Sequence, residues 1–212
     1  TTEQFFEIFS SYNRAIWPFQ IALYGIALVC VAMVWVPVKA SGRVISSILA
    51  FLWAWMGIAY HVLFFSEINP AAFLFGALFV LQAAITLWTG LVRDRLHFGF
   101  KTSLKSAIGG LFILYGLAIY PVLNSALGHG FLDSPTFGLP CPTTIFTIGL
   151  FFMLKSPFPK YVLVIPIIWS AIGATAAFSL GVLPDLKLIV TGIAALALAL
   201  IPHSSRKAAS TK

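Results

Sequence analysis

Charged residues and cysteines are scarce in this chain of 212 residues. Only 9% of its residues are Asp, Glu, Lys or Arg, whereas a soluble domain carries about a quarter. So few charges cannot solvate the surface of a globule that also contains 20 Phe and 6 Trp. Soluble enzymes, secreted proteins and nucleic-acid-binding proteins are therefore excluded. The two cysteines, Cys30 and Cys141, are too few for a disulfide framework.

Catalytic motifs are also missing from the sequence. It contains no phosphate-binding glycine loop, no Ser-His-Asp arrangement and no HExxH string. Its 4 histidines are too dispersed for a membrane di-iron site, and haem ligation in a bundle needs paired histidines at similar depth. We therefore expect that the protein is not an enzyme and has no catalytic residue. Any cofactor or metal stays unknown at this point.

Long apolar runs dominate the chain, of which 60% is apolar. A bilayer core about 30 Å thick is crossed by roughly 20 helical residues, and seven stretches reach or approach that length. The sequence predicts an all-α fold, a polytopic transmembrane helix bundle with seven spans in one membrane-embedded domain, residues 1–212. An outer segment at residues 1–15 precedes the spans, and a polar cytoplasmic tail at residues 203–212 follows them. The expected spans are residues 16–36, 44–65, 71–92, 106–127, 139–154, 161–181 and 186–201.

Basic residues alternate sharply between the segments that join these spans. Short loops rich in Lys and Arg are retained on the cytoplasmic side. Two basic residues, Arg14 and Lys187, fall on one side, which predicts an N-terminus outside and a C-terminus inside. The other side holds eleven: Lys39, Arg43, Arg93, Arg95, Lys101, Lys105, Lys155, Lys160, Arg206, Lys207 and Lys212.

Candidate functional residues gather near the predicted outer surface. His61 lies one to two turns before Glu67 at the end of the second span, so it is placed within the apolar region beside Tyr60. A titratable side chain at that depth is unfavourable unless it faces the bundle interior or water, which makes His61 a functional candidate. The alternative is that His61 hydrogen-bonds a neighbouring helix.

Asn69 and Pro70 precede the third span and have two interpretations. Asparagine caps free helix amides and proline suits a first helical turn, so capping is the favoured interpretation. The string Asn69, Pro70, Ala71 also resembles the signature of aquaporin channels, which carry two such boxes rather than one.

Cys141, at the start of the fifth span, would be the N-cap or lie just before it. A helix N-terminus lowers the pKa of a thiol and favours a nucleophile or a soft-metal ligand, although a small apolar residue also suits a position between two prolines. Thr143 either lines a polar path or bonds within its own helix. Asp185, at the outer start of the last span, completes the ligand or transport candidates.

The stretch from Trp53 through His61 to Ala72, taken with the later string Pro142 to Thr147, resembles a bacterial membrane family known as domain of unknown function 6064. The resemblance covers most of the chain. It implies a multi-pass protein of the bacterial inner (plasma) membrane and carries no established activity. In such a family we expect Ala as often as Cys at the position of Cys141, which argues against an essential thiol.

Two functions fit these patterns. The first is a small-solute or ion transporter or channel, with an outward-facing entrance built from the second, third, fifth and seventh spans. The alternative is a non-catalytic accessory or scaffold subunit of a larger membrane complex. A cavity that reaches His61 favours the first function, and a dry bundle favours the second. The expected partners are the lipid bilayer and either other membrane subunits or further copies of this chain, with no nucleic acid.

Overall fold

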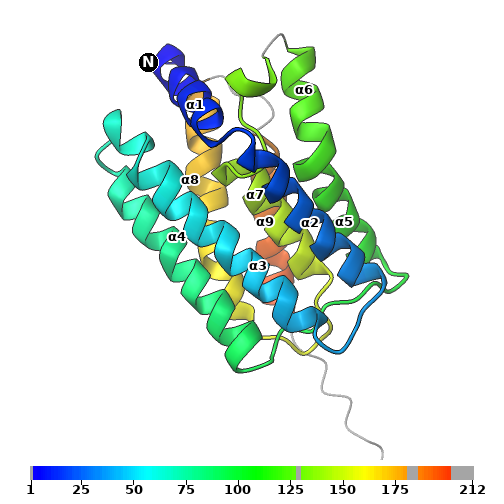
Figure 1. Ribbon diagram of the computed structural model, residues 1–212. Helices are drawn as coiled ribbons and strands as arrows, with labels where there is room; N and C mark the ends of the chain where they lie inside the picture. The colour runs from blue at the N-terminus through cyan, green and yellow to red at the C-terminus, as the bar shows by residue number, and fades with distance from the viewer. Residues whose placement is uncertain (1, 128–129, 181–185, 202–212) are drawn as a thin grey trace, which may run out of the picture.

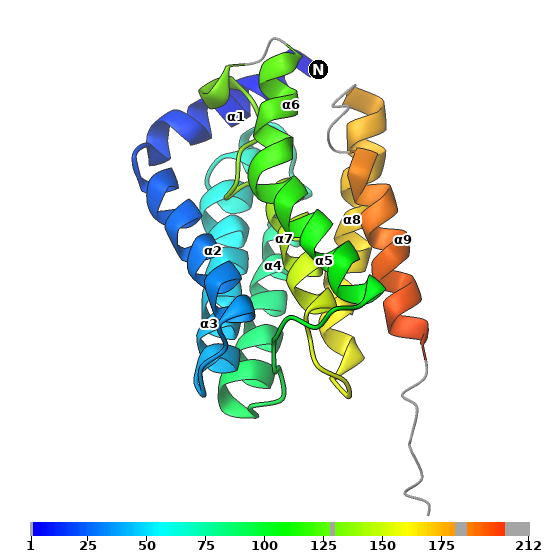
Figure 2. The same cartoon turned by 90° about the vertical axis from the view of Figure 1, so that its right-hand side faces the viewer.

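The computed structural model describes residues 2–127, 130–180 and 186–201 and shows an all-α bundle (Figure 1). The helices run roughly side by side and leave two distinct ends. We call one the α1 end, because α1 (Thr2–Ile16) lies across it together with the short helices η2 (Phe65–Glu67) and η5 (Phe131–Asp133). The other is the loop end, formed by residues 36–40, 93–103 and 153–160 (Figure 2).

The long elements follow the expected apolar stretches closely. After α1 they are α2 (Phe19–Trp35), α3 (Ser41–Trp55), α4 (Ala72–Leu87), α5 (Leu104–Leu114), α6 (Tyr120–Ala126), α7 (Pro140–Phe152), α8 (Val164–Leu180) and α9 (Lys187–Leu200). Three π-helical segments continue α3, α4 and α5: η1 (Met56–Val62), η3 (Trp88–Val92) and η4 (Tyr115–Ile119). The 3₁₀ turn η6 (Lys160–Leu163) leads into α8.

Three continuous helices among the described residues are long and apolar enough to cross a membrane: Ser41–Glu67, Ala72–Val92 and Leu104–Ala126. A fourth candidate is the pair α1 and α2, which is bent by 86°. The apolar helices Pro140–Phe152, Lys160–Ala176 and Lys187–Leu200 are shorter. The all-α class is thus confirmed. By length and composition, the described residues include three to four candidate spans, fewer than the seven that the sequence predicts.

The N-terminal segment was expected only to lie outside the first span, but it forms the amphipathic helix α1. Ile8, Phe9 and Tyr12 are buried, whereas Glu3 and Glu7 are exposed. Apolar side chains three or four residues apart share one helix face, and this face packs on the bundle. The chain then turns sharply before α2, so α1 covers the end of the bundle instead of extending it (Figure 1).

Helix α7 forms the centre of the bundle (Figure 2). Every residue from Pro142 to Phe152 is buried. Glycines allow its neighbours to approach closely: a Cβ atom on Gly109 would lie 2.7 Å from the carbonyl oxygen of Gly149, and one on Gly116 would lie 2.6 Å from that of Pro142. Small residues at such crossings permit the backbone contact that holds helices together in a membrane.

Basic residues at the loop end bind the carbonyl groups that helix C-termini leave unpaired. Lys105 donates from Nζ to the carbonyl oxygen of Leu154 at 2.6 Å, just beyond α7. Lys160 donates to the carbonyl oxygens of Ala199 and Ile201 at the end of α9. Positive charge is also favourable at a helix C-terminus, so these lysines stabilise the end where they gather.

Candidate binding cavity

A cavity of about 240 Å³ lies at the α1 end of the bundle. We call it the aromatic cavity, because the rings of Phe5 and Phe9 from α1 and of Trp169 from α8 contribute to its wall. The described residues that line it are Phe5, Phe9, Tyr60, His61, Phe65, Asn69, Phe75, Pro135, Leu139, Pro140, Cys141, Trp169, Ile172, Gly173, Thr175 and Ala176. Apolar pockets with a few converging polar groups are the usual form of small-molecule sites.

His61 enters this cavity from the π-helical segment η1. A π-turn adds a residue to the helical repeat and is frequent at functional sites. The segment packs closely on α4, where a Cβ atom on Gly76 would lie 2.8 Å from the carbonyl oxygen of Gly57 and 3.6 Å from Cβ of His61. The glycine contact therefore brings η1 and α4 together, and the imidazole is completely buried between α4 and α8.

Five aromatic rings surround the imidazole of His61. Their ring centroids lie 4.7 to 6.0 Å from that of His61, and the ring planes are inclined by 64° to 75°. Such edge-to-face contacts are a favoured arrangement for aromatic pairs. The rings belong to Tyr60, Phe65, Phe75, Phe79 and Trp169.

The side-chain nitrogens of His61 and Trp169 have no hydrogen-bond partner in the described part of the chain. Neither Nδ1 nor Nε2 of His61 is bonded, and the same is true of Nε1 of Trp169, whose side chain also lines the cavity. A buried polar group without a partner is destabilising by about 1–3 kcal/mol. His61 and Trp169 thus present unused donors and an unused acceptor at the cavity.

The wall of the cavity nearest α9 is formed around Gly173 of α8. A Cβ atom at this position would lie 3.6 Å from both Sγ of Cys141 and Nε1 of Trp169, and 2.8 Å from Cδ1 of Leu188. The thiol of Cys141 and the indole nitrogen of Trp169 therefore both lie near this glycine. Any larger residue at Gly173 would reduce the cavity.

A separate set of hydrogen bonds joins α1 and α2 to the segment that follows η5. Asn13 donates from Nδ2 to the carbonyl oxygens of Leu132 at 3.0 Å and Ser134 at 2.8 Å. Gln20 donates to Oδ1 of Asn13 at 2.7 Å and to Oγ1 of Thr136 at 2.8 Å. We call Asn13, Gln20, Ser134 and Thr136, all buried, the polar joint.

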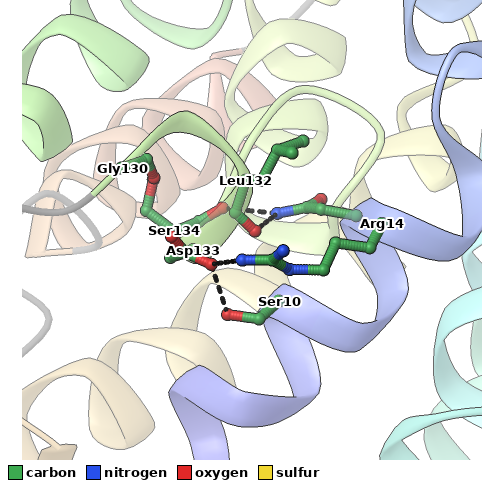
Figure 3. A network of polar contacts seen from close by, with 7 residues as sticks. Ser10, Arg14, Gly130, Leu132, Asp133 and Ser134 are labelled. Atoms are coloured by element: carbon green, nitrogen blue, oxygen red, sulfur yellow. Dashed lines mark hydrogen bonds and ion pairs between the residues drawn. The ribbon is translucent and has the colours of Figure 1, made fainter.

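Asp133 binds the exposed side of α1 next to the polar joint through hydrogen bonds and an ion pair (Figure 3). Its Oδ1 accepts hydrogen bonds from Nη2 of Arg14 at 2.9 Å and from Oγ of Ser10 at 3.0 Å. These two hydrogen bonds hold the pKa of Asp133 below its ordinary value of 3.8, and the bond from Arg14 makes the larger contribution. The position of α1, and with it that of Phe5 and Phe9 in the cavity wall, depends on both sets of contacts.

The candidates chosen from the sequence divide into two groups. His61, Tyr60, Asn69 and Cys141 line the aromatic cavity together. Glu67 is exposed on η2 and is not part of the lining. Asp185 lies outside the described residues.

Thr143 is completely buried and belongs to the scaffold around α7. Its Oγ1 accepts a hydrogen bond from the backbone amide of Gly138 at 3.0 Å. Thr147 donates back to the carbonyl oxygen of Thr143 at 2.8 Å, which is the intrahelical alternative. Both threonines therefore stabilise the start of α7 and do not line the cavity.

Two helix starts differ slightly from the expectation. Asn69 accepts a hydrogen bond from the amide of Ala71 at 3.0 Å, and α4 begins at Ala72. Cys141 lies inside the first turn of α7, because Pro140 already occupies the first helical position, and Leu139 is the N-cap. Leu139, Pro140 and Cys141 all line the cavity.

The helices that form the cavity also differ from the expected set. The second, third and fifth predicted spans contribute, as expected, through η1, α4 and α7. The sixth span, α8, contributes in place of the seventh, because Leu188 of α9 packs behind Gly173. Trp169, Phe5 and Phe9 were missed, although the spacing of Phe5, Phe9 and Tyr12 could have indicated the buried face of α1.

The described lining of the cavity has few side chains that could coordinate a metal ion. Among the described residues there is no group of three or more His, Cys, Asp and Glu side chains that could hold one. No Asp, Glu, Lys or Arg from the described part of the chain lines the aromatic cavity. The arrangement can instead accommodate a molecule with an apolar body that hydrogen-bonds to His61 and Trp169.

Comparison with known proteins places the chain in one family. Neither the curated proteins nor the solved structures include a match to it. The model of a family of unknown function, DUF6064, matches residues 2–210, which is nearly the whole chain. The chain therefore belongs to the DUF6064 family.

Proposed function

We propose that this protein is a small-solute or ion transporter or channel of the bacterial inner membrane, with its binding site open to the outer side. The proposed function involves no catalysis. The observation that carries it is the pair of buried side chains, His61 and Trp169, which line one cavity and whose polar atoms have no partner among the described residues. Polar groups inside membrane helices commonly mark the route of a solute or ion.

Seven crossings, with the N-terminus outside, are part of this proposal. The three shorter helices, α7, α8 and α9, lie beside the longer candidate spans in the same bundle (Figure 2). The basic residues Lys39, Arg95 and Lys155 belong to the loop end, which agrees with a cytoplasmic position for that end. The α1 end would then face outward, with α1 at the membrane surface as an amphipathic helix.

The cavity is closed toward the loop end, which supports an outward-facing state. Trp53 is completely buried below His61, and its ring lies 4.5 Å from that of Phe79. Nε1 of Trp53 donates to Oγ1 of Thr147 at 3.1 Å, so the indole is fixed between α3 and α7. A solute that entered at the α1 end would meet His61 before reaching this packed layer.

Flux measurements in proteoliposomes test the transport proposal. Stopped-flow light scattering would follow entry of three uncharged probes, urea, glycerol and nicotinamide, and of potassium chloride. We expect at least one probe to enter faster than in empty liposomes, and that excess to disappear in His61→Leu. Equal rates for all probes with and without the protein would contradict transport and favour the accessory subunit.

Labelling of the two cysteines tests the orientation independently of flux. A membrane-impermeant maleimide applied to intact cells should react with Cys141, which lines the cavity, and leave the completely buried Cys30 unmodified. Alkaline phosphatase fused after Asp133 should be active, and the same fusion after Arg95 should be inactive. The reverse pattern of fusions would overturn the proposed topology.

A further inference from the structure

We infer that the aromatic cavity selects an uncharged solute that consists of one flat apolar ring and an amide or similar hydrogen-bonding head. This inference rests on the proposed function, because it names the class of solute for the same site. It separates uncharged solutes from ions, which the transport proposal leaves open. Three properties of the cavity carry it: its size, its charge and its hydrogen-bonding groups.

The size fits a single ring with a small substituent. An apolar protein cavity of roughly 150 Å³ holds one benzene molecule. The aromatic cavity, at about 240 Å³, leaves additional room for a head group of a few atoms. Its walls contain the flat rings of Phe9, Phe75 and Trp169, against which a second flat ring packs favourably.

The absence of charge in the lining disfavours ions. Among the residues that the structure describes, no acidic or basic side chain lines the cavity, and His61 is surrounded by aromatic rings. The acidic residues described near the lining along the chain are not part of it: Glu3, Glu7 and Glu67 are exposed and Asp133 is half-buried. A buried charge without a partner is strongly unfavourable, so a charged solute would lose more hydration than the site replaces.

The hydrogen-bonding groups match an amide. The indole of Trp169 is a donor only, whereas a neutral imidazole offers one donor and one acceptor. An amide has complementary groups: its oxygen can accept hydrogen bonds from Trp169 and His61, and its nitrogen can donate one to the acceptor nitrogen of His61. Binding would therefore satisfy polar atoms that are unpartnered in the described chain, which is the source of the expected preference over a purely apolar ring.

Four probes of nearly equal size separate these contributions. Benzamide carries the neutral head, benzoate the negative and benzamidine the positive one, and toluene has no polar head. Titration calorimetry would compare the four in lipid nanodiscs that contain the protein, after subtraction of empty nanodiscs. We expect benzamide to bind at least about tenfold more tightly than each of the others, which corresponds to one or two hydrogen bonds.

Matched substitutions test the roles of the two side chains. His61→Leu and Trp169→Phe should each reduce benzamide affinity severalfold while leaving toluene binding nearly unchanged. His97→Leu and Trp88→Phe are the controls, because both residues are exposed and lie outside the cavity. A loss of benzamide affinity in the controls as large as in His61→Leu would contradict the assignment.

The outcomes distinguish this inference from the transport proposal. Equal affinity for benzamide and benzoate, or preferential binding of either charged probe, would overturn the uncharged solute class even if flux is observed. Selective, His61-dependent binding of benzamide without any flux would support the site and contradict transport. Binding of none of the four probes to a folded protein would overturn the inference as well.

Discussion

The polar joint and the aromatic cavity lie at the same end of the bundle, and Asn13 in the joint differs from His61 and Trp169 in the cavity in how its polar atoms are bonded. In the joint, the amide of Asn13 donates to two carbonyl oxygens and accepts from Gln20 and Thr136. In the cavity, the side chains of His61 and Trp169 are also buried, but their nitrogens have no partner among the described residues. Within the described chain, the fold thus satisfies the amide of Asn13, which holds α1 in place, although Oε1 of Gln20 stays unbonded, and it leaves the polar atoms of both His61 and Trp169 unbonded.

This difference separates a structural role from a binding role. A hydrogen-bonded group stabilises the folded state, so its removal should weaken the protein. An unpartnered group destabilises the empty protein, so its removal should have little effect on stability or improve it. Substitutions at the two places should therefore differ in sign, and the predictions below follow from that contrast.

The largest loss of stability is expected for Asn13→Ala. The substitution removes the two bonds to the carbonyl oxygens of Leu132 and Ser134 and leaves Gln20 with one acceptor fewer. We expect a loss of about 2–3 kcal/mol in the free energy of unfolding, measured by thermal unfolding in detergent. Ser11→Ala, on the exposed side of α1, is the control, and an equal effect of both substitutions would contradict the role of the joint.

Substitution of two threonines, one bonded and one unbonded, provides a matched comparison, and the expected change in the free energy of unfolding is intermediate. Thr136 is bonded to both Asn13 and Gln20, whereas Oγ1 of Thr144 is buried and has no partner within the described segments. Thr136→Val should lower the free energy of unfolding by about 1–2 kcal/mol, and Thr144→Val should leave it unchanged or raise it slightly. A larger loss for Thr144→Val than for Thr136→Val would contradict the comparison.

His61→Leu should make the empty protein more stable, by about 1 kcal/mol. Leucine has a similar volume and carries no polar atom that needs a partner. The substitution therefore removes the free-energy cost of burying the imidazole nitrogens without hydrogen bonds. The unfolding temperature of this variant should exceed that of the wild type and of the control His97→Leu. A clear destabilisation by His61→Leu alone would mean that the imidazole is already bonded inside the bundle.

The smallest effect is expected for the exposed pair of Arg14 and Asp133. Because the bonds from Arg14 and Ser10 lower the pKa of Asp133, the carboxylate stabilises the fold at pH values above its ordinary pKa of 3.8. That contribution is lost as the pH falls through the lowered pKa of the folded state. The difference in unfolding temperature between wild type and Asp133→Asn should therefore be small at neutral pH and vanish in acid.

Part of this picture could be predicted from the sequence. The apolar runs located the helices within a few residues, because the hydrophobic length of a span is a property of consecutive residues. His61 stood out for the same reason, as a titratable residue within such a run. Tyr60, Asn69 and Cys141 were found near it because all of them flank the same predicted membrane surface.

The rest depends on contacts between distant parts of the chain. Trp169 meets His61 only because α8 packs beside η1, and nothing in the residues around Trp169 indicates that neighbour. The π-turns that place His61, and the folding back of α1 that adds Phe5 and Phe9, arise from tertiary packing. Thr143 was a candidate because of its polarity, but its partner proved to be the amide of Gly138.

The central claim is that the imidazole of His61 is unbonded in the empty protein and bonds to an uncharged solute. Nitrogen NMR of histidine-labelled protein in nanodiscs tests this directly, with the His61 signal assigned by its absence in His61→Leu. We predict that saturating benzamide shifts the His61 signal and that benzoate leaves it unchanged, with the His97 signal constant in both titrations. A His61 signal that is unmoved by benzamide, or moved equally by benzoate, would contradict the account.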